Sequence, residues 1–158
     1  MDKPEKSCGM LGPDQPLVEA FLDHPNFSQF SAEELKALRD CCKEKVLVEG
    51  EVLFSECEAG LSMYIVKKGS IKIYKMGFLG ETVIAQINPG EFVGEMAVID
   101  SSPRSATVKA IVNTELLELS RDSFNNLKKE FPMVAIKLMD LLLRSLSLRL
   151  RNTTAKLI

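Results

Sequence analysis

A short stretch of the sequence contains residues suited to holding a phosphate group. Gly94 has no Cβ, so the backbone there can approach a ligand closely. Arg104 carries a planar, permanently charged guanidinium that can bind two phosphate oxygens, and Pro103 stiffens the chain just before it. Residues 95–99 can form one helical turn whose first amides face an anion. The stretch from residue 90 to residue 108 therefore predicts an anion-binding site.

Glu95 lies within this stretch, although its carboxylate would repel a phosphate. A carboxylate has a role there if it accepts hydrogen bonds from sugar hydroxyls, as the acidic residue of dinucleotide-binding sites does. An anion site beside a hydroxyl acceptor predicts a nucleotide as the ligand.

Two short motifs resemble the phosphate-binding cassette of the cyclic nucleotide-binding domain family. They read Gly94-Glu95-Met96-Ala97 and Pro103-Arg104-Ser105-Ala106. The family includes the bacterial catabolite activator protein, the protein kinase A regulatory subunits and the cyclic nucleotide-gated channels. The resemblance extends from about residue 27 to residue 155. It implies a β jelly-roll barrel that binds a cyclic nucleotide and has no catalytic activity.

The resemblance also implies roles for individual residues. Arg104, Ser105 and the amides near Ala97 and Ala106 would hold the cyclic phosphate. Glu95, together with the neighbouring glycine, would bind the ribose 2′-hydroxyl. Met96 belongs to the motif, but we expect its side chain and that of Val98 to fill the core rather than contact the ligand, and the same holds for Phe92.

Four further residues are expected near the ribose and the base by the same resemblance. Ile84 and Ala85 match positions that flank both groups, with a plain role in the strand core as the alternative. Thr153 and Thr154 resemble a hydroxyl pair on the activator's long helix that meets the adenine amino group. Their alternative is a frayed helix end without a ligand role.

The base is expected to be adenine. In some cGMP-binding members a hydroxyl at the position of Ser105 meets the guanine amino group, but the activator also has serine there and uses cAMP. We therefore expect cAMP rather than cGMP, with no cofactor and no metal. The expected ligand site is: Gly94, Glu95, Met96, Ala97, Arg104, Ser105, Ala106, Ile84, Ala85, Thr153 and Thr154.

Composition argues against several other kinds of partner. The net charge is −2, with 20 Lys and Arg against 22 Asp and Glu mixed along the chain, so no basic surface for nucleic acid is expected. No run of eighteen apolar residues is present, which argues against a membrane span. The four cysteines include no Cys-x-x-Cys pair, and the N-terminus does not look like a signal peptide. We therefore expect a cytoplasmic protein with reduced thiols.

An enzyme is not expected. A metal-dependent jelly-roll enzyme needs two or three histidine ligands in its barrel, and the only histidine is His24, outside the expected strands. No Ser-His or Cys-His pairing for nucleophilic chemistry is available. One alternative to a nucleotide receptor stays open: a ligand-free structural or interaction module of the same fold, contacting a partner through its C-terminal helix.

The barrel is expected between residues 45 and 119, where short β-rich runs alternate with Gly, Pro and Asn turn signals. About eight short strands favour a jelly roll, and the fold class is mainly β with flanking helices. The strands are expected near 46–48, 52–54, 63–66, 71–74, 83–87, 107–112 and 116–119.

Helices are expected on both sides of the barrel. Residues 1–15 are predicted to be a flexible tail, and 16–44 to form N-terminal helices. The first of these runs from Leu17 to Leu22, and a capping-box pattern at Ser31 starts a later one. Residues 120–158 are predicted to form C-terminal helices that act as a lid or a dimerisation element.

The last helix is expected from Met133 to about Lys156, after a short helix capped by Ser120. Its apolar stripe has no sustained heptad repeat, so packing over the barrel and pairing with a second copy both stay open. By resemblance to the bacterial activators, a homodimer through residues 133–156 is favoured. The chain stops about where the ligand-sensing helix ends, so we expect a standalone bacterial-type member without a DNA-binding domain, acting on an unknown protein effector. The stripe comprises Ala135, Met139, Leu142, Leu146 and Leu150, broadened by Leu138, Leu141 and Leu148.

Overall fold

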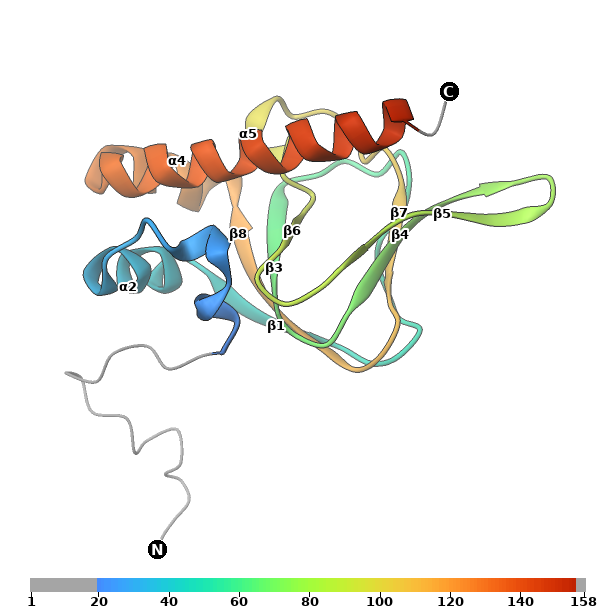
Figure 1. Cartoon of the computed structure of the whole chain (residues 1–158), viewed down its shortest axis with the longest axis horizontal. Coiled ribbons are helices and arrows are strands. Elements are labelled where there is room, and N and C mark those ends of the chain that lie inside the picture. The colour runs from blue at the N-terminus through green and yellow to red at the C-terminus, as the bar shows by residue number, and fades with distance from the viewer. Residues whose placement is uncertain (1–19, 156–158) are drawn as a thin grey trace, which may run out of the picture.

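The computed structural model describes residues 20–155. Figure 1 shows a β-barrel with helices gathered along one side and a long helix crossing over it. The tail expected at residues 1–15 lies outside the described residues, as do Lys156 and the first part of the helix expected from Leu17 to Leu22. None of the helices described has the length and hydrophobicity that a membrane crossing requires.

The strands form two four-stranded antiparallel sheets, which is the jelly roll that the sequence predicted. One sheet has the order β1-β8-β3-β6 and the other β2-β7-β4-β5. A core of side chains from both sheets, such as Leu116 and Val66 facing Ile71 and Val108, fills the space between them. The strands are β1 (Lys43–Leu47), β2 (Val52–Phe54), β3 (Ser62–Lys68), β4 (Ile71–Gly77), β5 (Gly80–Ile87), β6 (Phe92–Val93), β7 (Thr107–Ala110) and β8 (Thr114–Ser120).

Most of the expected strands are present, with changed ends. The alternation of buried Ile71 and Ile73 with Lys72 is confirmed, because one face of β4 lies on the core. β6 was not predicted, since a pair of residues is too short to show any periodicity. Phe92 in this strand is 1 % exposed, which confirms its expected core position.

The helices begin where the capping patterns predicted. Ser31 accepts from the amide of Glu34, and the Glu34 carboxylate accepts from the amide of Ser31, which makes a complete capping box. Ser120 accepts from the amide of Ser123 and caps the next helix. The helical elements are η1 (Ala20–Asp23), η2 (Pro25–Phe27), α2 (Ala32–Asp40), α3 (Met96–Ile99), α4 (Arg121–Glu130) and α5 (Pro132–Ala155).

The first half of the apolar stripe expected on the last helix packs on the core of the same chain, and the second half is exposed. A helical core formed with α2, α4 and one face of the first sheet buries only residues up to Leu142. Leu148 and Leu150 are 57 % and 67 % exposed. The reason is that the second half of α5 runs past this core and across the open side of the barrel (Figure 1). The buried residues of α5 are Val134, Ala135, Leu138, Leu141 and Leu142.

Candidate functional site

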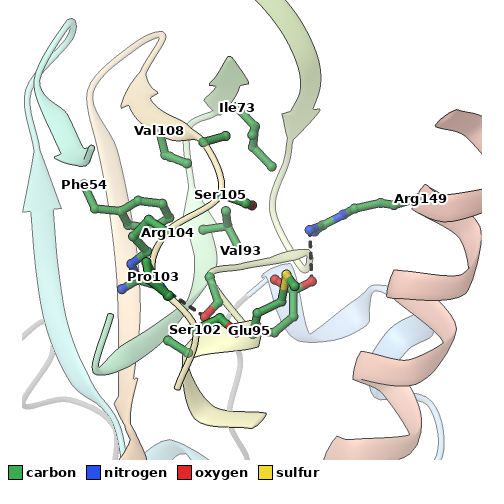
Figure 2. Close-up of a pocket in the computed structure, with 14 residues that line it drawn as sticks. Phe54, Ile73, Val93, Glu95, Ser102, Pro103, Arg104, Ser105, Val108 and Arg149 are labelled. Atoms are coloured by element: carbon green, nitrogen blue, oxygen red, sulfur yellow. Dashed lines mark hydrogen bonds and ion pairs between the residues drawn. The ribbon is translucent and has the colours of Figure 1, made fainter. Parts of the chain in front are cut away.

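The predicted cassette forms one wall of a pocket between the two sheets and α5 (Figure 2). β6 leads into α3, and an irregular segment then returns to β7, so residues 94–106 curl around the pocket. The pocket measures about 420 Å³ when its open mouth is counted. Its lining includes every cassette residue that the sequence singled out: Gly94, Glu95, Met96, Ala97, Arg104, Ser105 and Ala106.

Arg104 is buried and held by the backbone of the barrel. Its side chain is 8 % exposed, with Nη1 donating to the Gly94 carbonyl at 3.2 Å and Nη2 donating to the Ser62 carbonyl at 2.8 Å. The guanidinium carbon lies 3.9 Å from the centre of the Phe54 ring, a cation–π contact. Nε has no hydrogen-bond partner among the described residues. A buried arginine fixed in this way is a preformed cation with a donor still to satisfy.

Two glycines leave the space that Arg104 fills. A Cβ built on Gly60 would lie 2.8 Å from both Cζ and Nε of Arg104. Gly94 has a φ of +77°, in the left-handed region that glycine adopts without strain, and a Cβ there would lie 2.7 Å from Nη1. The sequence assigned Gly94 to the close approach of a ligand, whereas here its missing Cβ makes room for Arg104. Gly60 was not singled out as a site residue.

Burial also lowers the pKa of the Arg104 guanidinium, because desolvation disfavours the charged form. Tyr64, Glu58, Glu118 and Glu95 act in the opposite direction and raise that pKa. The guanidinium stays charged near neutral pH, because arginine is effectively always protonated in proteins. The site therefore holds a cation that a bound anion would stabilise further.

The short helix α3 is tied to the start of α4 by Arg121. Its Nη2 donates to the Ala97 carbonyl at 2.6 Å and to the Gly60 carbonyl at 3.1 Å, and its Nε donates to the Ala97 carbonyl at 3.1 Å. A four-residue helix leaves such carbonyls without partners of its own. In this conformation the Ala97 amide, which was expected to face the phosphate, donates to the Gly94 carbonyl at 3.1 Å.

Glu95 is the most buried acid of the described residues, at 2 % exposed. Arg149 of α5 reaches across the pocket toward it, with Nη1 2.9 Å from Oε2 (Figure 2). The contact is close enough for an ion pair, but Oε2 has no partner with hydrogen-bond geometry. Nη2 of Arg149 donates to the Phe92 carbonyl. The carboxylate is thus charge-balanced and still able to accept from a hydroxyl.

Three of the four residues expected near the ribose and the base line a second cavity, which shares Arg149 with the first. Ile84, Ala85 and Thr153 line it together with Arg149, so β5 and the end of α5 face each other there. Ile84 is 39 % exposed, which argues against a plain core role. The Thr154 hydroxyl donates instead to the Leu150 carbonyl at 2.9 Å, and Thr154 is not among the lining residues.

The remaining cassette side chains divide into core and surface. Ala97 and Ala106 are buried at 2 % and 5 %, and Val98 is buried as predicted. Met96 was expected to fill the core, but it is 42 % exposed and lines the pocket. That prediction is wrong because α3 packs its other face inward. Ser105 is exposed at the pocket wall.

Sequence reasoning missed four residues of this site: Phe54, Gly60, Arg121 and Arg149. Each acts through a contact with a residue far away in the chain, and no local spacing reports such a contact. A partial signal existed for Arg149, because it is a charged residue one turn before Thr153 on a helix expected to cover the ligand. Within residues 20–155, no cluster of three His, Cys, Asp or Glu side chains is suited to a metal ion.

Comparison with known proteins identifies the family of the chain. The cyclic nucleotide-binding domain family matches residues 44–131. The chain is 32% identical over 123 residues to the cyclic AMP receptor protein of Thermus thermophilus, covering 77% of this chain and 57% of that protein. It is 32% identical over 112 residues to the cAMP-dependent protein kinase regulatory subunit of Yarrowia lipolytica, covering 70% of this chain and 29% of the relative.

A solved structure has the same fold. The cyclic nucleotide-binding domain from Methylobacillus flagellatus superposes with a TM-score of 0.76 at 29% identity, covering 82% of this chain and 74% of the other. The chain spans just over half the length of the first of the two curated relatives and under a third of the second. The family match spans more than half of the chain and contains both cassette motifs, and the chain belongs to the cyclic nucleotide-binding domain family.

Proposed function

We propose that the protein is a non-catalytic receptor for a 3′,5′-cyclic nucleotide, with cAMP preferred over cGMP. One observation carries the proposal: Arg104 and Glu95 line one pocket, both are buried, and each keeps a polar atom without a hydrogen-bond partner. A cyclic nucleotide offers an anionic phosphate for the arginine and a 2′-hydroxyl for the glutamate. Unpaired buried groups cost stability, and the ligand would recover that cost.

The phosphate would bind beside Arg104, whose guanidinium is already oriented by the Gly94 and Ser62 carbonyls. The Ser105 hydroxyl lies at the same wall and can donate to a phosphate oxygen. No large movement of the arginine is needed, so little of the binding free energy is lost in ordering it.

The preference for adenine rests on Thr153. Its side chain lines the second cavity opposite Ile84 and Ala85, where a base attached to the ribose would lie. A threonine hydroxyl can accept from the adenine amino group. The printed name of the Thermus thermophilus relative, a cyclic AMP receptor protein, agrees with this choice.

The signal would pass through Arg149. This residue connects the ribose-binding carboxylate to α5, so a ligand that changes the position or charge balance of Glu95 also changes the support of α5. Ligand shifts such an equilibrium only if it binds one arrangement of α5 more tightly than the other.

Calorimetric titration with cAMP and with cGMP tests the proposal. We expect a dissociation constant of about 1 μM or lower for cAMP, weaker binding of cGMP, and no measurable heat with Arg104→Leu. Arg151→Leu is the matched control, because Arg151 lies on the exposed face of α5 and donates only to the Ser147 hydroxyl. An absence of heat with both nucleotides would reject the receptor and leave the ligand-free interaction module.

A second proposal, a homodimer through α5, rests on its exposed face. Ile136, Leu143 and Leu150 are 52 %, 64 % and 67 % exposed and recur every seven residues, the spacing of a helix pair. We expect sedimentation equilibrium to give twice the chain mass, and Leu143→Glu to give the monomer mass. The same mass for wild type and for Leu143→Glu would contradict the dimer.

A further inference from the structure

A groove on the far side of the helical layer from the nucleotide pocket has no assigned role. It lies between the first turns of α2 and the junction of α4 with α5, and measures about 750 Å³ when its open side is counted. α2 and α5 are linked beside it by the Lys137 ammonium, which donates to the Glu34 carboxylate at 2.6 Å and to the Gln29 carbonyl at 2.9 Å. The groove therefore has two helical walls held at a fixed separation.

The floor of the groove is apolar and open to solvent. Phe131, between α4 and α5, and Met133, in the first turn of α5, flank Pro132 and are 46 % and 56 % exposed. Val134 continues the floor into the buried helical core. Two large adjacent apolar side chains left open beside a groove are the arrangement that receives the apolar face of a partner helix.

The rim of the groove is acidic. All three charged residues that line it are glutamates: Glu33, Glu34 and Glu130. Glu34 is satisfied by Lys137 and by the Ser31 amide. Glu33 and Glu130 are exposed and make no ion pair or side-chain hydrogen bond with another residue from 20 to 155. Two free carboxylates beside an apolar floor complement a ligand that is both basic and apolar.

We propose that this groove docks a basic amphipathic helix of a partner protein. Leucine-type side chains of the helix would cover Phe131 and Met133, and its lysines or arginines would pair with Glu33 and Glu130. The helix-in-groove arrangement suits the two helical walls. The inference does not depend on the nucleotide pocket, since no residue of the groove lines that pocket.

A second copy of the chain is a poorer occupant. The basic residues of α5, such as Arg144 and Arg151, lie toward its far end, so a copy docking them into the groove would make a head-to-tail contact. Contacts of this type propagate into open chains unless a rotation closes them. A helix from a separate partner protein would fill the groove of one molecule without building an open chain of molecules.

The test uses a fluorescein-labelled peptide of about 18 residues that places leucine on one helical face and lysine on the other. A matched peptide carries glutamate at every lysine position. Fluorescence anisotropy with the whole protein should show binding of the lysine peptide and at least about tenfold weaker binding of the glutamate peptide. Equal affinity for both peptides would overturn the proposal.

Variants of the protein test whether the peptide binds at the groove. The double variant Glu33→Lys, Glu130→Lys and the single variant Met133→Ala should each weaken the lysine peptide, the double variant by about tenfold or more. Glu49→Lys, in the exposed turn between β1 and β2, is the control for the charge change at one site and should leave the affinity unchanged. If the double variant does not fold by circular dichroism, Glu130→Gln replaces it, with a smaller loss expected.

Two outcomes would contradict the docking site. A loss of affinity equal in Glu49→Lys and in the groove variants would show that net charge alone attracts the peptide. A change of mass between wild type and Met133→Ala in sedimentation would show that the groove is an interface between copies. Arg104→Leu should bind the peptide as wild type does, so failure of nucleotide binding and failure of peptide docking are separate results.

Discussion

Two arginines reach the proposed ligand pocket from opposite sides, and the protein holds them in different ways. Arg104, on the barrel side, is 8 % exposed, donates to two backbone carbonyls and stacks on Phe54. Arg149, on the helix side, keeps 28 % of its side chain exposed and extends from the half of α5 that lacks a core beneath it. On the barrel side the arginine is anchored to buried backbone, whereas on the helix side it extends from an exposed half of α5.

This difference matters for how binding could become a signal. A fixed cation contributes affinity without moving, because its orientation is already determined before the ligand arrives. A side chain on a loosely packed helix can keep or lose its partner when a ligand binds, and the position of the helix then changes with it. We therefore expect substitutions on the barrel side to reduce affinity, and substitutions on the helix side to change the behaviour of α5.

The largest expected effect comes from Arg104→Lys. Lysine keeps the charge but loses the planar guanidinium. It therefore cannot donate to the Gly94 and Ser62 carbonyls and still offer a further N–H group to the ligand. We expect cAMP affinity to fall about 100-fold, which corresponds to about 2.7 kcal/mol, measured by calorimetry. Arg149→Lys keeps a cation beside Glu95 and should cost less than about tenfold. Equal losses in the two variants would remove the distinction between a fixed and a movable side.

A smaller effect is expected from Gly60→Ala. The added Cβ would lie 2.8 Å from the Arg104 guanidinium and 2.9 Å from the Ala97 Cβ, so the arginine has to shift. Overpacking of this kind costs about 1–3 kcal/mol of stability, and we expect about tenfold weaker cAMP binding as well. Gly77→Ala is the control, because the nearest atom to its Cβ is 3.9 Å away. Unchanged affinity in Gly60→Ala would show that the position of Arg104 is not critical.

Much of the barrel side of the pocket could be predicted from the sequence, because its signals come from residues that are close together in the chain. The two cassette motifs, the capping box at Ser31 and the N-cap at Ser120 are patterns of neighbouring residues, and the structure forms them where the patterns lie. Gly60 escaped notice because its requirement comes from Arg104, forty-four positions later in the chain. A glycine at a turn looks the same whether it bends the chain or makes room for a distant side chain.

The helix side was harder to predict because periodicity does not show where a core ends. The leucines of α5 continue to Leu150, but the helical core beneath them stops at Leu142. Beyond that point the same spacing places apolar side chains in solvent and Arg149 over the pocket. The two halves of one helix therefore have different surroundings that their sequence does not distinguish.

Arg149→Ala examines the helix side directly. Removing the ion pair with Glu95 and the donation to the Phe92 carbonyl should loosen the second half of α5. We expect faster hydrogen exchange of the amides from residue 144 to 155, with unchanged exchange in the first half. Arg151→Ala is the control, since its donation to Ser147 stays within the helix. Faster exchange along the whole of α5 would mean that the helix has no separately held half.

The smallest effect concerns the fixed half of α5, which Lys137 ties to Glu34 of α2. The hydrogen bond from Lys137, and then that from the Ser31 amide, lower the pKa of Glu34 below its ordinary value of 4.5. Because the folded-state pKa is the lower one, the stabilisation is present above about pH 4.5 and is lost as the pH falls through the folded pKa. The melting temperature of Lys137→Met should thus lie below that of wild type at pH 7, and the gap should narrow as the pH falls through the folded-state pKa of Glu34. Lys36→Met, which removes an exposed pair with Asp40, is the control for general acid effects and should show little gap at either pH. A gap for Lys137→Met that does not change with pH would assign the role of Lys137 to its contacts with the Phe30 ring and the Gln29 carbonyl rather than to its ion pair with Glu34.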